Sequence, residues 1–176
     1  MNGFIVFLRV TPLINTGFFV GISMIKLKCK CNKVNIKGDI TMIEYMNTLD
    51  NITPDNLDGF FVGWPNPPSV TKHYELLEKS AYIWLAVDSE TKNVVGFITA
   101  ISDEVLAAYI PLLEVLPDYK GKGIGKRLME NMLSTLSAFY MIDLLCDQEL
   151  QEYYETFNML RSQGMVFRNY QNQSGR

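Results

Sequence analysis

The segment LPDYKGKGIGKR, residues 116–127, joins a predicted strand to a predicted helix and carries three glycines. Glycines let the backbone turn tightly and bring several N–H groups into one concavity at a helix start, where partial positive charge binds phosphate. Four basic residues lie in the same stretch, namely Lys120, Lys122, Lys126 and Arg127. We therefore predict that this turn binds a diphosphate group.

The glycine spacing differs from that of two common nucleotide-binding loops. A Walker-type loop has four residues between its first glycine and the Gly-Lys pair, and then Ser or Thr. Here three residues separate Gly121 from Gly125, and Arg127 follows Lys126. The dinucleotide fingerprint also fails because Gly121, Gly123 and Gly125 are evenly spaced. A nucleoside-triphosphate enzyme is therefore disfavoured, and an ordinary glycine-rich connection is the alternative to a diphosphate site.

The turn resembles the signature loop of the GNAT superfamily of acetyl-CoA-dependent N-acyltransferases, Arg/Gln-x-x-Gly-x-Gly/Ala, which follows a strand that ends in apolar-x-Val. Residues 113–115 read Leu-Glu-Val, Pro117 follows, and Gly123 and Gly125 fall at the signature positions. Lys120 stands at the Arg/Gln position and keeps the charge, but it lacks the planar fork of arginine. The resemblance implies donor-binding roles for Leu113, Val115, Lys120, Gly121, Lys122, Gly123, Ile124, Gly125, Lys126 and Asp147.

A second segment extends the resemblance downstream of the turn. Tyr154 takes the position of the family's tyrosine, Asp147 that of an asparagine, and Asn158 that of a glycine, whose left-handed conformation asparagine tolerates. The resemblance implies that Tyr154 protonates the departing thiolate, while Asp147 lacks the amide that would donate to the pantetheine arm. Tyr153 points about 100° away on a helix, so we expect it in the core.

The resemblance also implies direct attack of an amine on the acetyl thioester in a ternary complex. An alkyl amine is only about one part in 10³ free base at neutral pH, so a base helps. Glu114 is the conspicuous carboxylate of the predicted strand and is either that base or a carboxylate at the rim of the substrate site. The family role of Val115 is to offer its backbone N–H to the oxyanion.

The acceptor is expected near the loop that carries Phe60, Phe61 and Trp64, although these aromatic residues could equally close the core. Carboxylates that could meet a cationic acceptor are Asp55, Asp58 and Glu104. The single histidine, His73, lies in a predicted helix, where packing is the ordinary role for such a residue and catalysis the rarer one.

The order of the predicted strands and helices indicates an α/β fold with a mixed sheet. The resemblance implies an α/β (α+β) single domain whose sheet is mostly antiparallel, with helices on both faces. The sheet should be splayed at the cofactor slot, because Pro111 cannot donate to a strand ladder and because the family lays pantetheine beside a strand that diverges from residues 141–145. Thr53-Pro54 marks a helix start. Strands are predicted at 41–46, 81–87, 93–101, 105–116, 141–145 and 165–167, and helices at 69–79, 123–139 and 149–163.

Length and composition fit one domain with a substantial core. The chain has 176 residues, of which 48% are hydrophobic. Sixteen Lys and Arg against nineteen Asp and Glu give a net charge of −3, which argues against nucleic-acid binding. Three cysteines indicate a reducing, cytoplasmic compartment. Cys29-x-Cys31 has only Cys146 and His73 as further zinc ligands, so no metal is expected.

The first 23 residues are apolar but are interrupted by Arg9, Pro12 and Asn15. Three interpretations stay open: a weak signal or anchor, an extra strand, or translated upstream sequence ahead of a start at Met24. Residues 24–176 are taken as the GNAT-like domain, with 1–23 as a doubtful extension.

The sequence thus predicts an N-acetyltransferase that transfers the acetyl group of acetyl-CoA, its co-substrate, to a primary amine of a small molecule or peptide. No nucleic-acid or membrane partner is expected, and the oligomeric state stays open. The alternative is a non-catalytic acyl-CoA-binding or regulatory module on the same fold.

Overall fold

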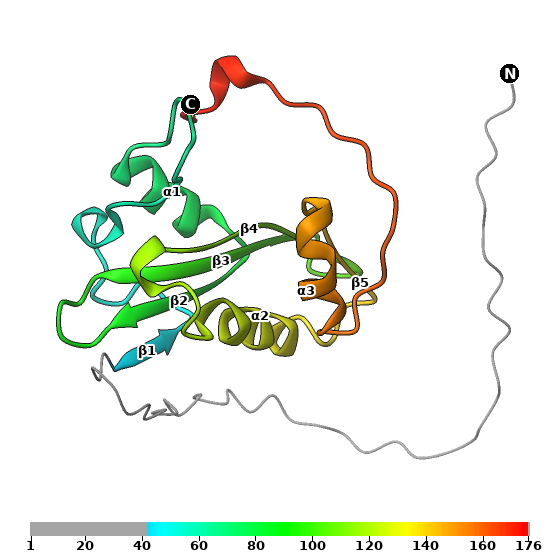
Figure 1. Cartoon of the computed structure of the whole chain (residues 1–176), viewed down its shortest axis with the longest axis horizontal. Helices are drawn as coiled ribbons and strands as arrows, with labels where there is room; N and C mark the ends of the chain where they lie inside the picture. The colour runs from blue at the N-terminus through cyan, green and yellow to red at the C-terminus, as the bar shows by residue number, and fades with distance from the viewer. Residues whose placement is uncertain (1–41, 176) are drawn as a thin grey trace, which may run out of the picture. The chain divides into compact units, whose positions relative to one another are not determined.

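The computed structural model describes residues 42–175, which form a five-stranded sheet in the order β1-β2-β3-β4-β5 (Figure 1). The first four strands pair antiparallel, and β5 runs parallel to β4. The mixed, mostly antiparallel sheet expected from the sequence is therefore confirmed. The strands are β1 (Ile43–Met46), β2 (Tyr82–Asp88), β3 (Val94–Ser102), β4 (Ala107–Val115) and β5 (Met141–Leu144).

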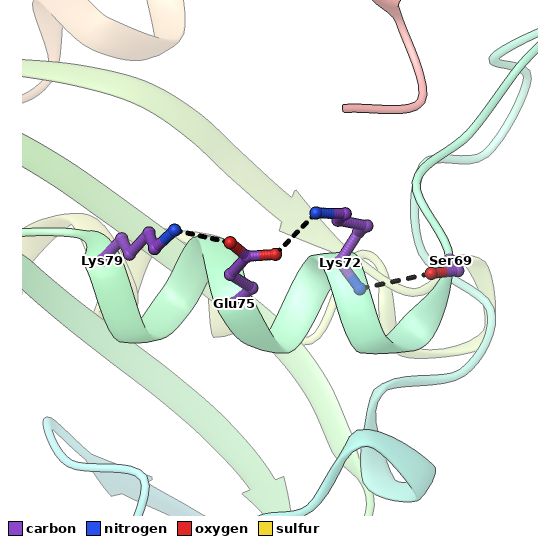
Figure 2. Close-up of polar contacts among 4 residues, drawn as sticks. All are labelled: Ser69, Lys72, Glu75 and Lys79. Carbon is purple, nitrogen blue, oxygen red and sulfur yellow. Dashed lines mark hydrogen bonds and ion pairs between the residues drawn. The ribbon is translucent and has the colours of Figure 1, made fainter. Parts of the chain in front are cut away.

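Helices follow the predicted starts. Ser69 caps the first long helix by accepting a hydrogen bond from the backbone N–H of Lys72 at 3.2 Å (Figure 2). Thr53 and Pro54 open a short 3₁₀ turn. The described helices are α1 (Val70–Lys79), α2 (Ile124–Thr135) and α3 (Gln151–Glu155), with 3₁₀ turns at Pro54–Leu57, Pro117–Tyr119, Gln148–Leu150 and Tyr170–Asn172.

The two faces of the sheet carry separate hydrophobic clusters, as the alternation along β2 shows. Trp84 and Ala86 pack in the cluster that contains the apolar side of α2. Leu85 and Val87 belong to the other cluster, together with Leu77 of α1. Because successive strand residues point to opposite faces, both faces need a cover, and helices on both faces are thus confirmed.

Gly96 of β3 allows α2 to lie close against the sheet. A Cβ at this position would come within 3.2 Å of the side chains of both Ile124 and Leu128 and 3.3 Å from the carbonyl oxygen of Glu114. A side chain here would therefore push the first turns of α2 away from β3 and β4.

Pro111 marks the place where β4 leaves its regular pairing. Thr99 pairs with Leu112 and Ile101 with Tyr109, so two residues of β4 oppose one residue of β3 at a bulge. Pairing with β5 covers only Ala107–Ile110 of β4. Among the described residues, the last part of β4 therefore has a free edge on its β5 side, which is the predicted splay.

The C-terminal part of the chain corrects two predictions. The predicted helix at 149–163 is a 3₁₀ turn followed by α3, and Asn158 then takes a left-handed φ of 62°, which ends the helical path. The predicted strand at 165–167 is wrong, since the described segment forms no ladder there and leaves Met165 fully exposed. Short apolar runs cannot by themselves specify a partner strand.

Two sequence expectations lie outside the described residues: the extension at 1–23 and the Cys29-x-Cys31 pair. None of the helices described between residues 42 and 175 has the length and apolar character that a membrane span requires.

His73 on α1 is a core residue. Its side chain is 1% exposed and packs among the rings of Phe60, Phe61 and Phe97, with centroid distances of 4.4–5.1 Å. Burial lowers the pKa of His73 to about 4, because the charged imidazolium is poorly solvated there. The packing interpretation of this histidine is therefore favoured over a catalytic one.

We predict that His73 makes the protein acid-sensitive. Between pH 6.5 and about 4 the unfolded chain protonates this histidine while the folded chain does not, so the free energy of unfolding falls by about 3 kcal/mol as the pH drops through that window. Urea unfolding from neutral to acidic pH should show this loss, and His73→Phe should remove it. Parallel pH profiles for the two proteins would contradict the prediction.

Candidate functional site

The glycine turn is anchored to the sheet by a buried carboxylate. The Tyr119 hydroxyl donates to Asp88 at 2.8 Å, and the backbone N–H groups of Glu90 and Thr91 also donate to Asp88. Burial alone would raise the pKa of Asp88, but these three hydrogen bonds lower it below its ordinary value. The approach to the turn is thus fixed at the end of β2.

The turn presents a run of free backbone donors. Gly121 and Gly123 adopt left-handed φ values of 74° and 78°, and a Cβ at either would meet open space. None of the N–H groups from Gly121 to Lys126 donates a hydrogen bond within the described part of the chain. The first intrahelical bond runs from Arg127 N–H to Gly123 at 3.1 Å. Such donors at the start of a twelve-residue helix fit an anionic group.

Three of the four basic side chains belong to the same exposed turn as these donors. Lys120, Lys122 and Lys126 are exposed at the turn, and the Lys122 ammonium lies 4.8 Å from the centre of the Tyr119 ring. The fourth predicted cation, Arg127, pairs instead with Glu130 on α2 at 3.6 Å. The Ile124 side chain is buried in the core, so this residue offers only its backbone N–H to a ligand.

The free edge of β4 adjoins the turn. The N–H of Leu116 donates to the Val95 carbonyl of β3 at 2.9 Å. Because successive N–H groups of a strand point to opposite edges, the N–H groups of Val115 and Leu113 face away from β3. Their side of the strand is the edge that β5 leaves after Ile110. A polar, extended ligand could therefore pair with this edge as an added strand would.

Glu114 is bound to the aromatic loop. Its carboxylate accepts hydrogen bonds from the backbone N–H of Phe61 at 2.9 Å and of Val62 at 3.1 Å. Glu114 lies opposite Phe97 in the ladder, on the α1 side of the sheet, while Leu113 and Val115 pack toward α2. The carboxylate therefore holds the loop against β4, on the face opposite to the α2 core.

The two tyrosines of α3 take different surroundings from those predicted. Tyr154 packs against the α2 core cluster, whereas the Tyr153 hydroxyl would be 3.5 Å from a Cβ at Gly125. The expectation that Tyr153 belongs to the core is therefore corrected: on this five-residue helix its ring lies edge-on to Tyr154, and its hydroxyl reaches α2. Burial raises the pKa of Tyr154, and the Cys146 thiol just after β5 raises it further.

A cavity of about 320 Å³ lies on the other face, between the aromatic loop, α1 and β4. Phe61, Trp64 and Leu112 line its apolar wall, while Phe60 is buried in the core instead. The chain end closes one side of it, where Gln173 accepts a hydrogen bond from the Asn66 N–H at 3.1 Å. The loop thus contributes Phe60 to the core and Phe61 and Trp64 to the lining of the cavity.

The charged wall of this cavity was not identified from the sequence. Glu75 of α1 pairs with Lys72 and Lys79, which lower the pKa of its carboxyl to about 2 (Figure 2). Because Lys72, Glu75 and Lys79 are three and four residues apart, the sequence indicates that they share one face of a helix. Only the fold places that face at the cavity. The predicted carboxylates Asp55, Asp58 and Glu104 do not line it.

The remaining predicted residues give no further site. Asp147 is exposed and precedes the 3₁₀ turn that leads into α3. Within residues 42–175, no group of three or more His, Cys, Asp or Glu side chains is arranged to hold a metal ion.

Among residues 42–175, a strand edge left by β5 thus leads into a helix start whose N–H groups have no partner. The model of the acetyltransferase (GNAT) family matches residues 49–159, and the chain belongs to this family. Members of the family use acetyl-CoA as the acetyl donor.

Individual relatives agree with this assignment. A crystal structure of a candidate acetyltransferase from Deinococcus radiodurans R1 is 38% identical, with a TM-score of 0.75, and the match covers 81% of this chain and 99% of that one. A GNAT family acetyltransferase from Streptococcus pneumoniae TIGR4 is 25% identical with a TM-score of 0.55, covering 73% and 98%. A histone acetyltransferase of Glycine max is 33% identical over 105 residues, which are 53% of this chain and 45% of that protein. The chain thus spans less than half of this curated relative.

Proposed function

We propose that this protein transfers the acetyl group of acetyl-CoA to a primary amine of a small molecule or peptide, by direct attack within a ternary complex. The observation that carries the proposal is the run of free N–H groups from Gly121 to Lys126 beside the open edge of β4. The donor supplies an activated acetyl group on a thiolate leaving group. Three cysteines, of which Cys146 is a free thiol, suit a reaction in the reducing cytoplasm.

The residues of the turn and of β4 fit the two ends of such a donor. The glycine turn, with Lys120, Lys122 and Lys126 around it, would hold the diphosphate. The backbone of Leu113 and Val115 would bind the pantetheine arm, and the Val115 N–H would stabilise negative charge on the reacting carbonyl oxygen. Asp147, just after the segment that includes β5, would flank the arm on the other side.

The acceptor would bind in the cavity between the aromatic loop and α1. Phe61, Trp64 and Leu112 offer apolar contacts to the body of an amine, and the loop is tied to β4 by Glu114. Glu114 does not itself line the cavity but holds the loop that does, and we propose its carboxylate as proton acceptor for the attacking amine, directly or through a water molecule. Donor and acceptor would then approach β4 from two sides.

Titration calorimetry with CoA and thiol release from acetyl-CoA test the proposed function together. We expect CoA binding, and thiol release that depends on one class within a panel of small amines, amino sugars and lysine peptides. A histone peptide belongs in the panel because one relative is a histone acetyltransferase. Binding without release for every amine would favour the non-catalytic module, and absence of CoA binding would reject both functions.

Tyr154→Phe should lower turnover while CoA affinity stays nearly unchanged. The phenol pKa of Tyr154 is raised by burial, so the hydroxyl keeps its proton at neutral pH and can donate it to a departing thiolate. Steady-state kinetics give kcat, and calorimetry gives the CoA dissociation constant. Unchanged kcat in the variant would remove Tyr154 from the mechanism.

The variant Glu114→Gln tests whether Glu114 acts as a base or only holds the loop in place. Gln keeps one oxygen for either the Phe61 or the Val62 N–H. If Glu114 accepts the proton, kcat/KM for the amine should fall roughly 100-fold near neutral pH. The difference in kcat/KM between the variant and the parent protein should then shrink as the pH approaches the amine pKa near 10.4, because free amine becomes abundant. A deficit that is equal at every pH would assign Glu114 to loop positioning alone.

A further inference from the structure

We propose that Tyr153 is a donor-binding residue whose hydroxyl hydrogen-bonds to the diphosphate of CoA together with the backbone of the glycine turn. The inference rests on the proposed function, because it requires that the diphosphate occupy the start of α2. It assigns the side chain next to Tyr154 to recognition of the donor and leaves proton transfer to Tyr154.

The hydroxyl of Tyr153 lies at the first turn of α2. A Cβ built on Gly125 would lie 3.5 Å from this oxygen and 3.6 Å from a methyl group of Val115. Gly125 is the second residue of α2, and its N–H is one of the donors without a partner among the described residues. The phenol oxygen therefore borders both the free donors of the turn and the last residue of β4.

Aromatic packing fixes the Tyr153 ring in this place. Its ring lies edge-on to Tyr154 at 5.1 Å and to Phe157 at 5.2 Å. Tyr154 and Phe157 themselves pack against the α2 core cluster, which Tyr153 does not join. The two neighbours thus connect Tyr153 to the core while its hydroxyl end stays at α2.

The hydroxyl has no hydrogen-bond partner among residues 42–175. The oxygen is not sealed from solvent, so a ligand that binds at the turn can reach it. Burial raises the pKa of Tyr153 to about 12, so the phenol keeps its proton at neutral pH and acts as a donor. A phosphate oxygen beside the N–H groups of Gly125 and Lys126 would accept that hydrogen bond, and the charge on the acceptor would strengthen it.

The neighbouring tyrosine supplies a matched control. Tyr154 faces the α2 core cluster, and burial, with a further contribution from the Cys146 thiol, raises its pKa. Both tyrosines are half-buried, both pack edge-on to each other, and both lose only one oxygen when replaced by phenylalanine. A difference between the two variants therefore reports where each hydroxyl acts rather than a general loss of packing.

The test is calorimetric titration of the full chain and of Tyr153→Phe and Tyr154→Phe with CoA and with dephospho-CoA, which retains the diphosphate but lacks the 3′-phosphate. We expect Tyr153→Phe to raise the dissociation constant about tenfold for both ligands, as loss of a hydrogen bond to a charged group implies. Tyr154→Phe should change it less than twofold. Thermal unfolding of each variant controls for folding.

Three outcomes would overturn the inference. In the first, Tyr153→Phe binds CoA with the affinity of the parent chain. In the second, Tyr153→Phe binds CoA more weakly but binds dephospho-CoA with the affinity of the parent chain. In the third, Tyr154→Phe loses as much affinity for CoA as Tyr153→Phe does. The first leaves the proposed function intact, because the parent chain still binds the donor. Failure of the parent chain to bind either ligand would instead reject the proposed function itself.

Discussion

The separation of β4 from β5 after Ile110 is the constraint on which the rest of the site depends. Pro111 has no N–H to contribute, and the bulge opposite Ala100 bends the strand at this point. Beyond it, β4 continues to pair with β3 while its other edge stays free of β5. In most sheets an unpaired strand edge promotes pairing with another chain. Here the edge leads directly into a helix start whose N–H donors have no partner among residues 42–175, so a single ligand could satisfy both.

Each wall of the site is held by a contact that spans a long stretch of the sequence. The Tyr119–Asp88 hydrogen bond ties the glycine turn to the end of β2. Gly96 lets α2 approach the sheet closely enough for its first turn to meet the end of β4. On the opposite face, Glu114 binds the backbone of the aromatic loop. The glycine turn follows β4 and the aromatic loop is bound to it, so a shift of this strand would disturb both.

The cavity beside α1 differs in character from the glycine turn. Its wall combines aromatic and aliphatic side chains with the Lys72–Glu75–Lys79 row, in which one carboxylate lies between two ammonium groups. These ion pairs are partly exposed, so they contribute little to stability and are screened by salt. They do give the cavity a charged border. Membership of the GNAT family follows from the match over residues 49–159, and in the proposed function this wall would contact the acceptor.

The sequence by itself determined the sheet strands up to β5, the start of α1 at Ser69, and the glycine turn, because periodicity, capping residues and glycine act over a few neighbouring residues. It also identified Pro111 as a break in the ladder. Only the tertiary structure decided which α3 tyrosine reaches Gly125, which side chains line the cavity, and that residues 165–167 form no strand among the described residues. The physical reason is that these outcomes depend on contacts between segments far apart in the chain. Local patterns do not specify such contacts.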